Sequence, residues 1–221
     1  MRERGRQERA VAEDAAWRAK VKDKHPVLGR VASALTAKPA VGETQSTKAW
    51  ATGGAGEQMI GKMLAGCSGI VSLHDRQVPG HGNANIDHIV VAPSGVYVVD
   101  TKRYNGTIEL RDTGSFFRPA ERLYVGGRDR TALVAAMAGQ VSAVHTALSN
   151  RTDPAKVAVH PVLCFVEGEF PLLRRKPYDV RGVLILWPRA LRTLVEAPGP
   201  LSAQQVQEVA SNLALALPSA G

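Results

Sequence analysis

One apolar hairpin carries two acidic residues and a lysine at the end away from its turn, and together these side chains could form a catalytic site. Asp87 opens the first of two apolar runs and Asp100 closes the second, with a turn signal at residues 93–95 between them. Lys102 follows Asp100 by two residues, so both side chains project from the same face of a strand. Two carboxylates and an ammonium group that converge in this way suit a hard divalent cation and a phosphodiester.

The geometry of these three residues depends on the length of the turn. A two-residue loop at 93–94 places Asp87 directly across from Asp100, whereas a three-residue loop shifts the register by one residue. In the second case a β-bulge is needed to bring Asp87 round. A surface ion pair of Asp100 with Lys102 or Arg103 is the alternative explanation of the triplet.

Helices before and after the hairpin carry two further candidates. Glu57 follows a glycine-rich stretch at residues 53–56 and precedes apolar residues at helical spacing, which predicts that it lies in the first turn of a helix. There it either interacts favourably with the helix dipole or belongs to a site. Gln140 lies within the apolar stripe of a helix expected over residues 131–148, where a buried amide needs partners. It is either a satisfied core amide or a group that reaches toward a site.

The remaining segments are expected to alternate between strands and helices. Besides the hairpin, we expect strands at 70–78, 107–111, 116–125, 157–166 and 182–187. Pro188 begins a short helix to residue 195, and Ser202 caps a last helix that ends near residue 217. Residues 168–179 are interpreted as a basic loop. This order predicts an α/β sandwich built on a mixed sheet.

The length of 221 residues suits one compact domain and an appendage. We expect a basic N-terminal arm and linker over residues 1–48, helical or partly disordered, and an α/β domain over residues 49–221. The arm holds 11 Lys and Arg against 6 Asp and Glu, or +5 of the net charge of +8. This excess suits an anionic partner such as nucleic acid or a lipid surface, and solubility alone explains it about as well.

The two cysteines, Cys67 and Cys164, indicate neither a disulfide framework nor a CxxC metal site. The N-terminus lacks the apolar core of a secretory signal. The small-apolar stretch at 131–148 contains polar residues such as Gln140 and Ser142, which predicts that it does not span a bilayer. We therefore expect a cytoplasmic protein without a transmembrane segment, and the oligomeric state stays open.

Taken in order, these candidates resemble the PD-(D/E)xK nuclease superfamily, and more closely its nuclease-related domain (NERD) family. The likeness spans roughly residues 50–150. The residues that carry it are Gly54, Ala55, Gly56 and Glu57; Asn85, Ile86, Asp87 and His88; the run from Gly95 to Lys102; Gly106; and Gln140. The D-x-K triplet alone is unspecific, whereas the three segments at these intervals are together fairly specific.

The resemblance implies a restriction-endonuclease-like αβββαβ sandwich and a metal-dependent nuclease that hydrolyses DNA. Asp87 and Asp100 are then expected to bind Mg²⁺ or Mn²⁺ together with the backbone carbonyl of Thr101, and Glu57 to complete the site directly or through water. Lys102 is expected to hold or activate the attacking water and to offset charge in the transition state. Gln140 is expected to orient a ligand or contact the substrate. DNA is expected to contact the active-site face and the basic arm.

Asp100 departs from the pattern of many family members, which carry Glu at this position. The motif allows Asp, but the side chain is shorter by one methylene, which changes where a metal can lie. A non-catalytic module that binds nucleic acid or a protein partner on the same fold is the alternative function. Retention of Glu57, Asp87 and Lys102 beside Asp100 favours the enzyme.

Overall fold

The apolar hairpin predicted from the sequence forms the centre of a six-stranded sheet. A computed structural model describes residues 45–79, 84–114, 120–149, 157–171 and 176–220. Strand β2 (Asn85–Ala92) pairs antiparallel with β3 (Gly95–Lys102), with Ala92 opposite Gly95 and a two-residue loop between them. Gly95 has φ 136°, and a Cβ there would lie 2.6 Å from the Ala158 carbonyl oxygen. Only glycine fits this turn.

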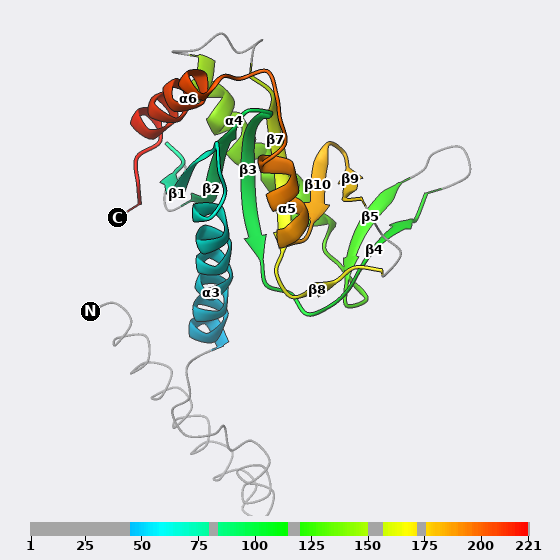
Figure 1. Ribbon diagram of the computed structural model, residues 1–221. Helices are drawn as coiled ribbons and strands as arrows, with labels where there is room; N and C mark the ends of the chain where they lie inside the picture. The colour runs from blue at the N-terminus through cyan, green and yellow to red at the C-terminus, as the bar shows by residue number, and fades with distance from the viewer. Residues whose placement is uncertain (1–44, 80–83, 115–119, 150–156, 172–175, 221) are drawn as a thin grey trace, which may run out of the picture. The chain divides into compact units, whose positions relative to one another are not determined.

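The sheet is mixed, with strand order β1-β2-β3-β7-β10-β9 (Figure 1). Strand β1 (Val71–Gln77) pairs antiparallel with β2, and β9 (Tyr178–Val180) pairs antiparallel with β10. Strands β7 (Val159–Phe165) and β10 (Val183–Leu186) run parallel to β3. The central strands are buried along nearly their whole length, which explains why their sequences are continuously apolar rather than alternating.

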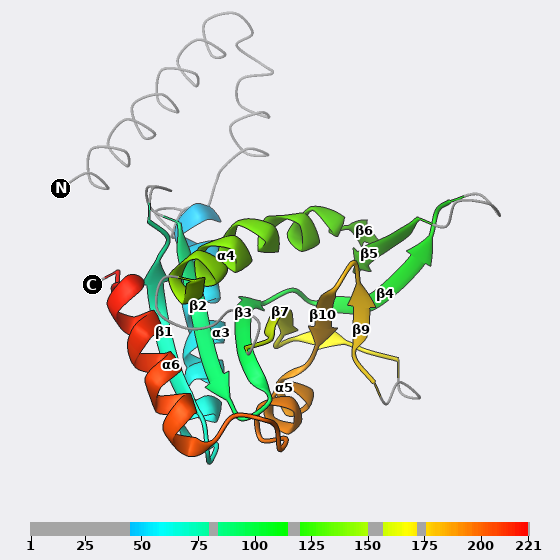
Figure 2. The same cartoon turned by 90° about the horizontal axis from the view of Figure 1, so that it is seen from above.

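Two separate apolar cores hold helices against the sheet (Figures 1 and 2). Helices α3 (Gln45–Ala65) and α5 (Pro188–Val195) contribute Ile60, Leu64 and Leu191 to one core, with Val90 and Val99 of the hairpin. Helices α4 (Thr131–Ser149) and α6 (Ala203–Ala216) contribute to the other core. The residues that they bury there with the hairpin residues Val91, Val96 and Val98 include Val134, Met137, Val206 and Leu213.

A second mixed sheet, of strand order β6-β5-β4-β8, follows β3 in the chain. Its strands are β4 (Gly106–Asp112), β5 (Glu121–Val125), β6 (Arg128–Asp129) and β8 (Gly168–Glu169). In both ribbon views β4 and β5 extend away on the side opposite to β1. The expected β-insert is therefore a sheet of its own, joined to the core through buried Ile108 and Leu123.

The described residues thus form a mixed α/β structure with two mixed sheets and four helices. The α/β class and the mixed sheet predicted from the sequence are confirmed. Helix α5 has the predicted bounds, with Pro188 at its start. Ser202 caps α6 as predicted: its hydroxyl accepts a hydrogen bond from the Gln205 amide, and the Gln205 side chain accepts one from the Ser202 amide.

The prediction that Glu57 lies in the first turn of a helix is wrong. Helix α3 begins at Gln45 and passes through the glycine-rich stretch, so Glu57 lies in its interior. Each glycine costs a helix about 1 kcal/mol relative to alanine. Gly56 is nevertheless buried, and a Cβ there would lie 3.4 Å from Thr101 Cγ2. The close approach of α3 to β3 at this point explains why the glycine is accommodated within the helix.

Other differences concern segments predicted as loops or as too polar for a membrane. The basic loop at 168–179 contains β8 and the start of β9. Its arginines 174 and 175 and the arm at 1–44 lie outside the described residues.

By length and composition alone, α4 could cross a membrane, contrary to the prediction from its polar residues. Its buried residues Val134, Met137 and Val144 instead pack in the core shared with the sheet, as in a helix of a globular domain.

Candidate active site

Asp87 and Asp100 lie opposite each other on neighbouring strands. Ala92 pairs with Gly95 and His88 with Val99, so the same register carries Asp87 to Asp100. This is the arrangement predicted for the two-residue loop, and no bulge intervenes. Asp87 Oδ2 accepts a hydrogen bond of 2.8 Å from the Thr101 amide, which fixes its carboxylate at the end of β3.

Lys102 binds Asp100 directly. Its Nζ lies 2.7 Å from Asp100 Oδ1, and the two side chains are 24% and 7% exposed. The ion pair considered as an alternative explanation is therefore present, but its carboxylate is buried rather than on the surface. Arg103, the other candidate partner, pairs with Glu167 instead. A buried carboxylate that is held by one lysine needs more compensation than an exposed pair does.

Negative charge is concentrated around Asp87. Burial, followed by the charge of Asp100, raises the pKa of Asp87 to about 7, although the Thr101 amide and Lys102 act in the opposite direction. Burial also raises the pKa of Glu57, followed by the charge of Asp75, while Lys102 lowers it and Asp100 raises it. Glu57 therefore lies within electrostatic reach of Asp100 and Lys102.

Lys102 remains a cation in this environment. Burial is the largest single influence and acts to lower its pKa. The charge of Asp100, the hydrogen bond to it and the charge of Asp87 together outweigh burial and raise the pKa of Lys102 above its ordinary value. An ammonium group with a raised pKa is suited to stabilising negative charge, and it is not a base at neutral pH.

The donor chemistry of this cluster fits a hard divalent cation. Three carboxylates against one ammonium leave a charge of −2 when all are ionised. Oxygen ligands are those that Mg²⁺ and Mn²⁺ prefer. The hydroxyl of Thr101 is also buried without a hydrogen-bond partner among the described residues. Across those residues, however, no three His, Cys, Asp or Glu side chains converge as a ready metal-ligand set, so Glu57, Asp87 and Asp100 do not form one as they stand.

Gln140 is not connected to the acidic cluster by any hydrogen bond among the described residues. Its Oε1 is buried and accepts no hydrogen bond from them. Its side chain as a whole is half-buried, so both interpretations of this amide stay open. The structure brings together Glu57, Asp87, Asp100 and Lys102, with Thr101 between the aspartates, and leaves the contact of Gln140 with the site a prediction.

Two features near the site were not predicted. Asp75 on β1 lies opposite Asp87, because the pairs His74–His88 and Arg76–Ile86 flank it. Its φ of 48° is unusual for a residue other than glycine, and its Oδ1 accepts a hydrogen bond of 2.8 Å from the Asn85 side chain. The second feature is a contact between His74 and His88. Both depend on how β1 pairs with β2, which the long connection between these strands does not reveal in the sequence.

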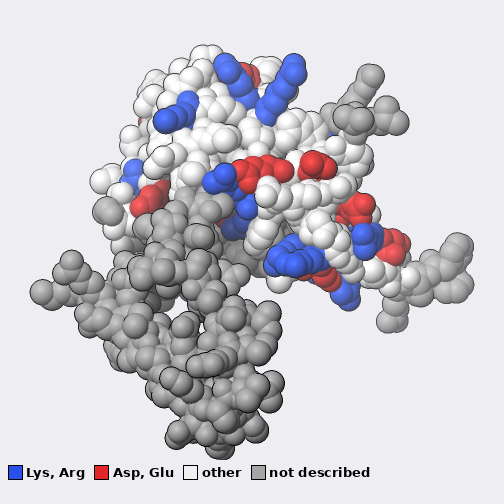
Figure 3. Space-filling model, turned by 90° about the horizontal axis from the view of Figure 1, so that it is seen from below, with Lys and Arg blue, Asp and Glu red and all other residues white. Residues whose placement is uncertain are grey.

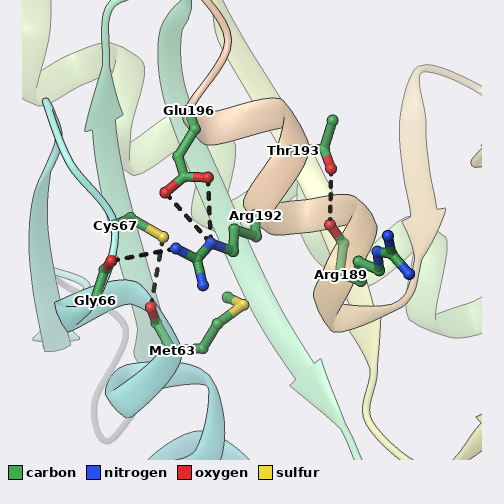
Figure 4. A network of polar contacts seen from close by, with 7 residues as sticks. All are labelled: Met63, Gly66, Cys67, Arg189, Arg192, Thr193 and Glu196. Atoms are coloured by element: carbon green, nitrogen blue, oxygen red, sulfur yellow. Dashed lines mark hydrogen bonds and ion pairs between the residues drawn. The ribbon is translucent and has the colours of Figure 1, made fainter.

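The C-terminal end of α3 is attached to α5 by a separate polar network (Figure 4). Arg192 pairs with Glu196 at 3.2 Å and donates to the Gly66 carbonyl at 3.4 Å. The thiol of Cys67 donates to the Met63 carbonyl, and burial followed by the charge of Glu196 raises its pKa. These contacts anchor the helix that carries Glu57, and the thiol is not poised for chemistry.

The charged side chains near this end of the molecule are mixed in sign. Strand β3 ends on the lower side of Figure 1, which is the side viewed in Figure 3. Among the described residues of that face, Lys and Arg side chains are interspersed with Asp and Glu rather than gathered into one basic patch. The described residues visible on this face therefore do not form one basic surface for a polyanion.

A family model for the nuclease-related domain matches residues 52–166, which is 115 of the 221 residues and includes every residue of the cluster. The chain therefore belongs to the nuclease-related domain (NERD) family, and the resemblance seen in its sequence is confirmed. Searches of curated proteins and of solved structures found no match. Membership of this family implies a nuclease-related function with nucleic acid as the substrate class.

Proposed function

We propose that this protein is a metal-dependent nuclease that hydrolyses phosphodiester bonds of DNA. The single observation that carries the proposal is the pair of half-buried Asp87 and buried Asp100, with Lys102 Nζ 2.7 Å from Asp100. Such a cluster is costly to bury unless a cation compensates it. The order of α3, the β1-β2-β3 meander, α4 and β7 supports a restriction-endonuclease-like αβββαβ core as part of the proposal.

The proposed ligands of Mg²⁺ or Mn²⁺ are Asp87, Asp100 and the Thr101 carbonyl, with Glu57 acting directly or through water. When bound, the cation supplies Lewis acidity toward the phosphate and lowers the pKa of a water molecule. Asp87 is held in place by the Thr101 amide, and Asp100 by Lys102. Asp100 would hold the cation with the carboxylate that now pairs with Lys102.

Lys102 is proposed to contact the phosphate and the attacking water. Because its pKa is raised, Lys102 is protonated before the substrate binds. It can then donate hydrogen bonds to oxygens that gain negative charge in the transition state. Its side chain is 24% exposed, so it can reach a substrate that lies over the end of β3. Gln140 is proposed to hydrogen-bond the substrate, or to orient a metal ligand, through its unpaired Oε1 or its amide nitrogen.

Residues 1–48 are proposed to add affinity for DNA without sequence preference. Their charge of +5 is the larger part of the net +8. Lys and Arg side chains that neutralise phosphates release counterions, which strengthens binding to any sequence. The mixed charges on the face in Figure 3 make such an additional contact useful to a nuclease of this fold.

The test is incubation of the purified protein with supercoiled, linear and single-stranded DNA in Mg²⁺, Mn²⁺ or EDTA. We expect cleavage with at least one cation and none in EDTA. Asp100→Asn and Lys102→Met are the controls for a contaminating nuclease. Any cleavage that both variants retain at the wild-type rate does not come from this site. Absence of cation-dependent cleavage on all three substrates contradicts the proposal.

One observation favours a second function, that of a non-catalytic binding module. Lys102 already neutralises Asp100, and the described acids do not converge on a common point. A protein that retains this closed ion pair would bind DNA equally well in EDTA and in Mn²⁺ and would cut none. Equilibrium binding to a fluorescent duplex under both conditions distinguishes the two functions.

A further inference from the structure

Two histidines contact each other on the face of β2 opposite to Asp87. His88 follows Asp87 in the strand, so the two side chains project to opposite faces. The His88 side chain is buried, with 3% exposure. Its Nδ1 lies 2.8 Å from Nδ1 of His74 on β1, and the two rings meet edge to face at 83°. This contact ties the strand that carries Asp87 to its neighbour.

The same pair contacts the helix that carries Glu57. A Cβ placed on Gly61 of α3 would lie 3.9 Å from Cε1 of both rings, so the helix backbone passes directly over the point where the histidines meet. Gly61 follows Glu57 by four residues, so the two positions lie on the same side of the helix, one turn apart. The His74–His88 pair therefore touches two of the three elements that supply carboxylates to the site, β2 and α3.

The direction of the hydrogen bond follows from its surroundings. Nε2 of His88 is buried and has no hydrogen-bond partner among the described residues, whereas Nε2 of His74 lies 3.1 Å from the Ser72 hydroxyl. A buried N–H without an acceptor is rarer and costlier than an unpaired acceptor. His88 is therefore assigned a proton on Nδ1, which it donates to Nδ1 of His74, and His74 donates from Nε2 to Ser72.

We propose that His74 and His88 are positioning residues for the divalent cation. The inference rests on the proposed function, and neither histidine is a ligand in it. Metal–oxygen distances tolerate only about 0.2 Å of variation. The pair links β1 and β2 to the backbone of α3, and so limits how far Asp87 and Glu57 can move apart when they close on a cation. Groups that hydrogen-bond directly to metal ligands change metal affinity about 10- to 100-fold when they are replaced, and we expect the lower end of that range for a pair that acts through the backbone.

Two substitutions of His74 separate positioning from bulk. His74 is exposed, so replacing it opens no cavity. In His74→Asn the side-chain oxygen takes the place of Nδ1 and can accept a hydrogen bond from Nδ1–H of His88. In His74→Gln the amide reaches the place of Nε2 and leaves His88 without its partner. The dissociation constant of Mn²⁺ is measured by isothermal titration calorimetry. We expect the Asn variant to remain within about threefold of wild type and the Gln variant to bind about tenfold more weakly.

Urea unfolding in EDTA is the parallel measurement, because a pair with only a structural role would move the unfolding midpoint and leave the Mn²⁺ dissociation constant unchanged. His88→Asn and His88→Leu repeat the comparison from the buried side, and the His74 variants decide the question if His88→Leu does not fold. Wild-type affinity for Mn²⁺ in the His74→Gln variant overturns the inference. If wild type itself binds no Mn²⁺ or Mg²⁺, the proposed function fails first and this inference falls with it.

Discussion

Replacing Asp87 by Asn is expected to stabilise the metal-free protein at pH 8 and to abolish its stabilisation by Mn²⁺. Burial and the charge of Asp100 raise the pKa of Asp87 to about 7 from an ordinary value of 3.8. The folded state therefore holds a proton that the unfolded state has lost between these two pH values. The free energy of unfolding then falls as pH rises from about 4 to about 7 and stays low above that range.

The size of the effect follows from the shift. Each pKa unit corresponds to 1.36 kcal/mol, so a shift from 3.8 to about 7 amounts to at most about 4 kcal/mol of lost stability at pH 8. Asn keeps the oxygen that accepts the hydrogen bond from the Thr101 amide and removes the charge. We expect Asp87→Asn to gain about 1 to 4 kcal/mol at pH 8 in EDTA and almost nothing at pH 4.

The assay is urea unfolding of both proteins at pH 4, 6 and 8, in EDTA and then in Mn²⁺. A cation at one hundred times its dissociation constant stabilises the wild type by about 2.7 kcal/mol. The variant, which lacks a ligand charge, should gain little from Mn²⁺. Asp75→Asn is the matched control, since Asp75 is exposed and is not a proposed ligand. Loss of stability at pH 8 in Asp87→Asn, or an equal gain from Mn²⁺ in both proteins, would refute the reasoning.

Three further predictions concern the chemistry, the arm and the fold. Asp100→Asn should lose cation-dependent cleavage while its DNA affinity in EDTA holds or improves, whereas Lys102→Met should bind Mn²⁺ but cut about 100-fold more slowly in single-turnover assays; equal cutting by both variants and wild type contradicts this. Removing residues 1–44, which hold 10 Lys and Arg against 6 Asp and Glu, should flatten the slope of log affinity against log salt by up to about 4 without changing the cleavage step, and an unchanged slope would assign the arm another role. Ser202→Ala should lower the free energy of unfolding by about 1 kcal/mol through loss of the capping box of α6, measured by urea unfolding, with no change in Mn²⁺ affinity.

The elements that the sequence predicted well are those whose signals are local. The hairpin register follows from a two-residue turn between two apolar runs. Helix α5 begins at a proline, and α6 begins at a serine followed three residues later by a glutamine. Each of these features is decided by residues within a few positions of one another, so chain order alone is sufficient to place them.

The features that the sequence did not predict depend on contacts between distant segments. By local propensity, the glycines before Glu57 favour a helix break. The close contact that accommodates Gly56 in the helix is made by Thr101, which is 45 residues further along the chain. The position of Asp75 opposite Asp87 requires the pairing of β1 with β2 across a connection whose register no turn motif determines. Membership of a family could suggest the acids, but not the histidine pair behind them.

The strand directions in the mixed sheet explain why residues from the start of β2 and from the end of β3 reach one site. Strands β3, β7 and β10 are parallel, and ligands in such sheets bind at the carboxyl ends of the strands, where Asp100, Thr101 and Lys102 lie. Because β2 is antiparallel to β3, its first residues lie at the same edge, so Asp87 joins them. The negative charge is therefore concentrated at this edge of the sheet. One lysine cannot balance that charge, and a divalent cation can.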